Sequence, residues 1–127
     1  MSNKVAVLMR RAPYGSVYTA EGFRSMMGIG VFEMDVRVIF VDDGVYALVK
    51  GQDPSALDMK SLGDGFPMLP DFEVTKFYVH DLSLAERGLT KDDLVLVLSR
   101  SEGMGVEVVD SATIARLLTE SGAVLPF

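Results

Sequence analysis

Residues 4–15 read KVAVLMRRAPYG, a continuous apolar run followed by a basic loop that contains proline and glycine. The run Lys4–Met9 lacks the alternation of a half-buried strand, so it predicts a strand that is covered on both faces. Residues 10–15 then form the loop that leaves this strand, and Ser16 can cap a helix that we expect over residues 16–30. A buried strand, a short loop and a helix in this order indicate an α/β fold.

The same alternation continues along the rest of the chain. Further apolar segments predict strands at residues 35–41, 74–79, 106–109 and 123–125. Helices are expected at residues 45–50, 82–87 and 111–121, with Gly88 as the left-handed cap of the second. Apolar residues at helical spacing predict the inner faces of the first and last helices, which are Ala20, Phe23, Met27 and Val31, and Ile114, Leu117 and Leu118.

This pattern predicts a three-layer α/β/α fold, with a mainly parallel sheet of about five strands. A chain of 127 residues suits a single domain, which we expect to span residues 1–127. Residues 51–54 are expected to form a turn and residues 101–105 a loop. The secondary structure of two segments stays open: residues 55–72 are helical or irregular, and residues 94–98 fit either a strand or a helix.

Composition narrows the classes of function. The net charge of −6 argues against direct nucleic-acid binding through a broad basic face. The absence of cysteine excludes disulfides, thiolate nucleophiles, cysteine-ligated zinc and any persulfide carried on this chain. No apolar run approaches the ~20 residues of a membrane helix, and no signal-peptide pattern is visible, so we expect a cytoplasmic protein without membrane contact.

The first candidate site is the loop RRAPYGS at residues 10–16. Arginines beside a helix N-terminus can hold a phosphate, a carboxylate or a partner's carboxylate. The alternative is a tight strand-to-helix turn in which Ser16 caps the helix and the arginines are solvated. The loop has neither the dinucleotide-binding nor the P-loop pattern, so it gives little support for a nucleotide. The candidate residues are Arg11, Pro13, Tyr14, Gly15 and Ser16.

Two further candidates follow the next two strands. Asp42 and Asp43 fit a Mg²⁺ site or an acid–base pair, but the simpler interpretation is that one carboxylate caps a helix at Val45. His80 is the sequence's only histidine, so a metal site there would lack a second histidine or cysteine. A Ser-His-Asp triad would need the pattern G-x-S-x-G, which is absent, and continued strand geometry would turn Asp81 away from His80. We expect no metal and no cofactor.

Four segments taken together resemble the DsrE/DsrF/DsrH superfamily, and its DsrF/TusC branch in particular: RRAPYG, FVDDGVYALVKGQDP, SLAERGL and the ending AVLPF. The resemblance runs nearly from end to end and is loosest at residues 55–72 and 91–105. It implies a subunit of a hetero-oligomeric sulfur-relay complex, assembled with DsrE/TusD-like and DsrH/TusB-like chains. Such complexes pass persulfide sulfur between proteins, for tRNA 2-thiouridine synthesis or for intracellular sulfur oxidation.

The resemblance also bears on His80. In this superfamily the sulfur-carrying cysteine belongs to the DsrE/TusD-like partner, and DsrF/TusC chains often have another cysteine at the end of the third strand. The match places His80 at that position, which implies that this chain is a non-catalytic subunit. Two alternatives stay open: a stand-alone homo-oligomer that binds a small anion through Arg10, Arg11 and the amides near Gly15 and Ser16, or an enzyme that uses His80 as a base with Asp42 or Asp43 to orient it.

Overall fold

The centre of the molecule is a five-stranded sheet in which every pair of neighbouring strands is parallel, in the order β4-β3-β2-β1-β5. The structure is a computed structural model, and it describes residues 3–14, 18–30, 32, 34–49, 74, 76–94 and 106–127. The strands are β1 (Lys4–Met9), β2 (Asp35–Phe40), β3 (Lys76–His80), β4 (Val106–Val109) and β5 (Ala123–Pro126). The predicted α/β fold with a mainly parallel sheet is confirmed.

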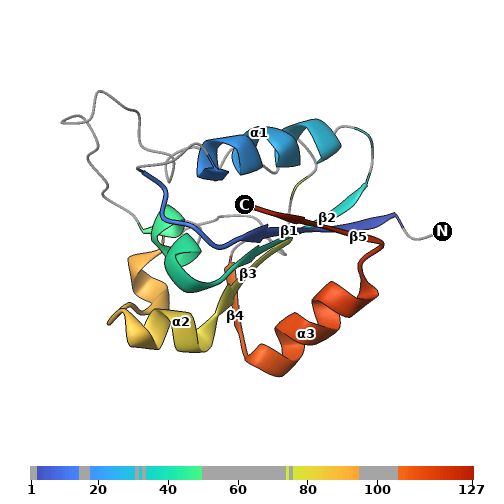
Figure 1. Cartoon of the computed structure of the whole chain (residues 1–127). Coiled ribbons are helices and arrows are strands. Elements are labelled where there is room, and N and C mark those ends of the chain that lie inside the picture. The colour runs from blue at the N-terminus through green and yellow to red at the C-terminus, as the bar shows by residue number, and fades with distance from the viewer. Residues whose placement is uncertain are drawn as a thin grey trace.

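Helices cover both faces of the sheet (Figure 1). The two longer helices, α1 (Tyr18–Gly30) and α3 (Ser111–Glu120), lie on opposite faces. Three shorter helices complete the described structure: η1 (Asp42–Leu48), α2 (Asp81–Glu86) and η4 (Lys91–Asp93). η1 and α2 pack against each other where β2 and β3 end. The three-layer arrangement follows because the crossovers between parallel strands place helices on both faces.

Each face of the sheet has its own apolar core. On one face Val7 and Phe40 are fully buried together with Met26 of α1. On the other face Ile39 packs with Leu117 of α3. Burial on both faces explains why the central strands are continuous apolar runs rather than alternating ones.

The inner face of α1 differs from the predicted one. Its buried side chains belong to Thr19 and Met26, and Gly22 is buried between them. A Cβ atom at Gly22 would lie 2.8 Å from Met9 Sδ, so the helix approaches β1 through its small residues. Helical periodicity alone favours large apolar residues, so it missed Thr19, Gly22 and Met26 as buried residues of this helix. The predicted inner residues within the described range are half-buried, namely Ala20, Phe23 and Met27, and Phe23 and Met27 do pack against the core.

The helix predicted from Val45 begins earlier, at Asp42, and is a 3-10 helix. Val41 is its N-cap residue, and no side chain accepts a hydrogen bond there. The prediction that Asp42 or Asp43 caps a helix at Val45 is therefore wrong. Both aspartates lie inside the first turn, where the helix dipole still favours a carboxylate.

The other predicted strands and helices have boundaries within two residues of the observed ones, whereas η4 was not predicted. Gly88 has a φ of +66°, as its predicted role as a left-handed cap requires. Leu94 forms an isolated antiparallel bridge with Val49. Within the described ranges, no helix is long and apolar enough to cross a membrane. Several predictions lie outside the described residues, namely those for Gly15, Ser16, Val31, Lys50 and residues 51–54, 55–72, 95–98 and 101–105.

Candidate functional site

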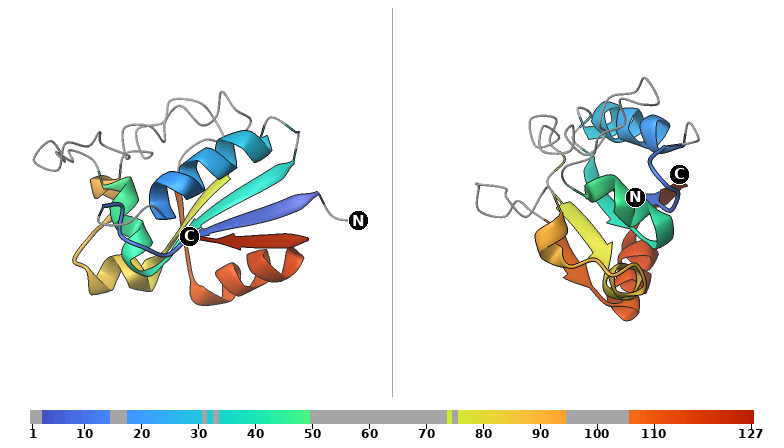
Figure 2. Two further views of the ribbon diagram at one scale, coloured as in Figure 1. Left: turned by 45° about the horizontal axis from the view of Figure 1, so that its top comes forward. Right: turned by 90° about the vertical axis from the view of Figure 1, so that its left-hand side faces the viewer.

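The first four strands end at one edge of the sheet, because they are parallel. The chain leaves this edge through residues 10–14 after β1, through η1 after β2, through α2 after β3, and through the start of α3 after β4. We call this region the carboxyl edge; the right-hand view of Figure 2 looks onto it. Ligand sites of open parallel sheets gather at such an edge. Every described candidate residue lies here.

His80, the last residue of β3, is held at both ring nitrogens. Nδ1 lies 2.8 Å from Ser83 Oγ, and Nε2 lies 2.7 Å from Ser111 Oγ. Ser83 belongs to the first turn of α2, and Ser111 is the first residue of α3. The His80 side chain is only 17% exposed, whereas Ser111 is exposed. The imidazole is therefore a fixed bridge between the starts of two helices.

Asp81 stays beside the His80 ring. Its Oδ1 atom lies 3.8 Å from Nε2 of His80 and accepts a 2.7 Å hydrogen bond from the N–H of Leu82. The expectation that Asp81 turns away assumed that strand geometry continues past His80. The chain instead enters α2 at Asp81, so the carboxylate remains on the side of the imidazole.

Ser83 connects His80 to the loop after β2. Its hydroxyl oxygen accepts a 2.9 Å hydrogen bond from the N–H of Asp42, and the residue is buried. Asp42 has a φ of +50°, in the left-handed region that side-chain-bearing residues seldom adopt. The hydrogen bond to Ser83 thus helps to hold an uncommon backbone conformation and ties η1 to α2.

Asp43 is bound to Arg87 and not to His80. Its Oδ1 atom accepts hydrogen bonds from Nη2 of Arg87 at 2.9 Å and from Nε at 3.1 Å. The hydrogen bond to Asp43 raises the pKa of the Arg87 guanidinium above its ordinary value. The same guanidinium donates to the carbonyl oxygen of Ser83 at 3.1 Å and lies 5.9 Å from the centre of the Tyr46 ring. Since two serines occupy the nitrogens of His80, neither aspartate orients it as the enzyme alternative requires.

The loop after β1 is tied to the start of α1. The guanidinium carbon of Arg11 lies 4.1 Å from the centre of the Tyr18 ring. The hydroxyl of Thr19 donates to the carbonyl oxygens of Arg11 and Ala12, at 3.3 and 3.1 Å. These contacts hold the loop against the start of α1. None of them pairs the Arg11 guanidinium with a carboxylate.

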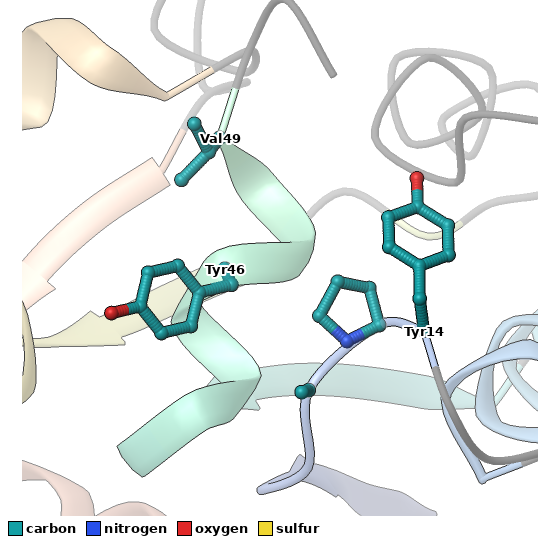
Figure 3. Close-up of a pocket in the computed structure, with 5 residues that line it drawn as sticks. Tyr14, Tyr46 and Val49 are labelled. Carbon is teal, nitrogen blue, oxygen red and sulfur yellow. The ribbon is translucent and has the colours of Figure 1, made fainter. Parts of the chain in front are cut away.

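Pro13 and Tyr14 of this loop line an open pocket of about 320 Å³, together with Ala12, Tyr46 and Val49. Figure 3 shows that Tyr46 and Val49 come from η1 and its end, whereas Tyr14 comes from the loop after β1. The lining consists of apolar and aromatic side chains. It therefore suits an apolar or aromatic group better than an anion.

The structure thus joins His80 and Asp42 through Ser83, and it places Pro13 and Tyr14 in one pocket with Tyr46. Arg11 lies on Tyr18 instead. Two important residues were not among the candidates from the sequence: Ser83 and Ser111. The spacing from His80 to Ser83 at a helix start is a local signal, but the contact with Ser111 depends on the pairing of β3 with β4. Across the described ranges, no group of three or more His, Asp and Glu side chains is arranged to hold a metal ion.

Comparison with known proteins gives matches to one protein family. Residues 3–127 match the DsrE/DsrF-like family. The chain is 42% identical to the intracellular sulfur oxidation protein DsrF of Allochromatium vinosum, over 98% of this chain and 96% of the relative. It is 33% identical to a TusC homologue of Pseudomonas aeruginosa, over 93% and 92% of the two chains. The crystal structure of the Escherichia coli ychN protein is similar over 100% of both chains, with a TM-score of 0.78 and 22% identity, which supports the fold alone.

Proposed function

Because the chain belongs to the DsrE/DsrF-like family, we propose that it is a non-carrying subunit of a sulfur-relay complex, which supports persulfide transfer by a cysteine-bearing partner. The relay serves either intracellular sulfur oxidation or tRNA 2-thiouridine synthesis. The higher identity to the sulfur oxidation protein, 42% against 33% for the TusC homologue, favours the first of these.

The observation that carries this proposal is the chemistry at the end of β3. Carrying sulfur as a persulfide requires a thiol, and the sequence has no cysteine. His80 stands where the resemblance places a cysteine, and its ring is fixed by Ser83 and Ser111. Imidazole forms no persulfide. The role left for this chain within the relay is to shape and support the site of a partner that has the thiol.

The carboxyl edge offers a surface for that partner. Leu82, beside His80, is 56% exposed, and Tyr46, which lines the pocket, is 38% exposed. Exposed large apolar side chains at the same edge of the sheet as an apolar pocket are typical of protein contacts, since a partner can bury them. We assign the contact with the cysteine-bearing subunit to Leu82, Tyr46 and the pocket.

The partners in this proposal are a DsrE/TusD-like chain with the cysteine and a DsrH/TusB-like chain. Transfer to tRNA belongs to the pathway as a whole, so this subunit needs no nucleic-acid-binding face of its own. The complex works in the cytoplasm, where thiols stay reduced and available for persulfide chemistry.

The test is purification of the tagged chain from the cells that express it, followed by native mass spectrometry of the intact assembly. We expect a cysteine-bearing DsrE-like chain in equal amount, together with a DsrH-like chain. Recovery of the tagged chain only as a homo-oligomer would contradict the proposal. That result would favour the alternative in which the chain binds a small anion by itself.

A further inference from the structure

We propose that Ser111 is an activated nucleophile, with His80 as its general base, and that it accepts acyl groups from small neutral or cationic esters. The proposal concerns an activity of this chain beside its place in a sulfur relay and does not depend on that place. The sequence lacks the pattern G-x-S-x-G, but a serine–histidine pair is recognised by its geometry and not by its position in a motif.

The distances meet the criterion for an activated serine. Ser111 Oγ lies 2.7 Å from Nε2 of His80, within hydrogen-bond reach of a base. A third group orients the base, because Ser83 Oγ lies 2.8 Å from Nδ1. Ser83 is itself anchored by the N–H of Asp42 at 2.9 Å. Nucleophile, base and positioning residue thus form one chain from the exposed surface to a buried hydroxyl.

The reactive form places the histidine proton on Nδ1. A hydroxyl oxygen has two lone pairs, so Ser83 Oγ accepts from Nδ1–H of His80 and from N–H of Asp42 at once. Nε2 is then free to accept the proton of Ser111. The Asp81 carboxylate lies 3.8 Å from Nε2, the nitrogen that takes up this proton.

The position of Ser111 allows a substrate to reach its hydroxyl. Ser111 is exposed and is the first residue of α3, shortly after β4 ends at Val109. Two acidic residues belong to its surroundings: Asp81, whose carboxylate lies 3.8 Å from Nε2 of His80, and Asp110, the preceding residue, whose carboxylate accepts the N–H of Thr113 at 2.8 Å. These charges oppose an anionic substrate, so we assign neutral or cationic esters to the site.

The reaction balances without an external oxidant or reductant. Ser111 Oγ bonds to the ester carbonyl carbon while its proton moves to Nε2 of His80. The carbon–oxygen bond to the alcohol then breaks, and the alcohol leaves with that proton. Water attacks the acyl-serine, again with proton transfer through Nε2, which releases the carboxylic acid and restores Ser111.

The experiment is labelling of the purified chain with a neutral dialkyl fluorophosphonate, with the modified peptide identified by mass spectrometry. We expect one adduct, on Ser111, and none in Ser111→Ala. Labelling of His80→Asn should be about 100-fold slower, the size of a typical general-base contribution. Ser121→Ala, at the C-cap of the same helix, is the matched control. The Ser121 hydroxyl donates to the carbonyl of Leu117, and the variant should label like the wild type.

An unmodified Ser111, or equal labelling of His80→Asn and the wild type, would overturn the proposal. The single histidine allows a second measurement that does not depend on labelling. Nitrogen-15 NMR of the wild type should show Nδ1 protonated and Nε2 unprotonated, and Ser83→Ala should change that distribution. Identical histidine signals in the two proteins would rule out Ser83 as the positioning residue.

Discussion

At the scale of single residues, the carboxyl edge depends on a close approach between η1 and β1. Gly44 is buried against the end of β1, and a Cβ atom there would collide with the carbonyl oxygen of Met9. Because the obstacle is backbone, no rotamer change can relieve it. Asp42, two residues earlier, has a φ of +50°. The turn that presents Asp42 to Ser83 therefore depends on the absence of a side chain at position 44.

We predict that Gly44→Ala lowers the free energy of unfolding by about 2 kcal/mol, since an added methyl group would overpack a buried contact. Gly28→Ala is the matched control: Gly28 is an exposed residue of α1, and no heavy atom is within 4 Å of its Cβ position. This control should gain about 1 kcal/mol from helix propensity. Urea denaturation measures both, and equal stability of Gly44→Ala and the wild type would refute the close approach.

At the scale of elements, α3 is fixed at both ends by carboxylates. Asp110 caps its start by accepting the N–H of Thr113 at 2.8 Å, and hydrogen bonds from the side chain of Thr113 and then from this N–H lower the pKa of Asp110. At its last turn, Glu120 accepts a 3.1 Å hydrogen bond from Nη1 of Arg37, a buried residue of β2. The helix that contributes Ser111 is thus held to the sheet by polar contacts as well as by its apolar face.

Removal of the cap should loosen the start of α3. We expect Asp110→Ala to lower Tm, because the N–H of Thr113 loses its acceptor. Asp110→Asn keeps a side-chain oxygen and should retain most of the wild-type Tm. Thermal melting followed by circular dichroism compares the three proteins. A Tm for Asp110→Ala equal to that of the wild type would argue against the cap.

The contact between Glu120 and Arg37 predicts a pH dependence of stability. The hydrogen bond from Arg37 lowers the pKa of Glu120 in the folded protein. As pH falls below about 4.3, the ordinary glutamate value, the unfolded chain takes up this proton before the folded chain does. The contribution is therefore present above that pH and is lost as pH falls through the lower, folded-state pKa.

The matched variant for this prediction is Glu120→Gln, which has no carboxylate at that position. Between about pH 6 and pH 3, its free energy of unfolding should fall less than that of the wild type. Denaturant unfolding at a series of pH values measures the difference. Parallel curves for the two proteins would show that the ion pair does not contribute.

At the scale of the whole molecule, the two ends of the sheet differ in what they expose. The carboxyl edge has the pocket, the His80 bridge and the exposed Leu82. At the opposite end, Phe32 lies between α1 and β2 and is 79% exposed. Both ends thus offer an apolar contact, but only the carboxyl edge combines it with the described pocket and the His80 bridge.

If the proposed contact is right, Leu82→Asp should release the proposed cysteine-bearing partner, because a charge would be buried in that contact. Phe32→Asp is the control at the opposite end and should leave the assembly intact. Native mass spectrometry of tagged complexes from cells compares the two variants. Loss of the partner in Phe32→Asp and its retention in Leu82→Asp would place the interface at the other end.

The sequence by itself determined the strands, most helix boundaries and the parallel α/β class, because burial on both faces imposes continuous apolar runs and Gly88 marks a left-handed cap. It also determined that no sulfur can be carried on this chain, since the sequence has no cysteine. These properties depend on neighbouring residues or on composition. They can therefore be read from the sequence without knowing which segments lie side by side in the fold.

Only the tertiary structure decided which polar groups meet. Ser111 reaches His80 because β4 pairs with β3, and Arg87 reaches Asp43 because α2 packs on η1. The inner face of α1 likewise follows from the fit of Gly22 against Met9, which helical periodicity does not express. Each of these contacts joins residues far apart in the chain, and strand order and helix packing set them through the shape of the assembled core.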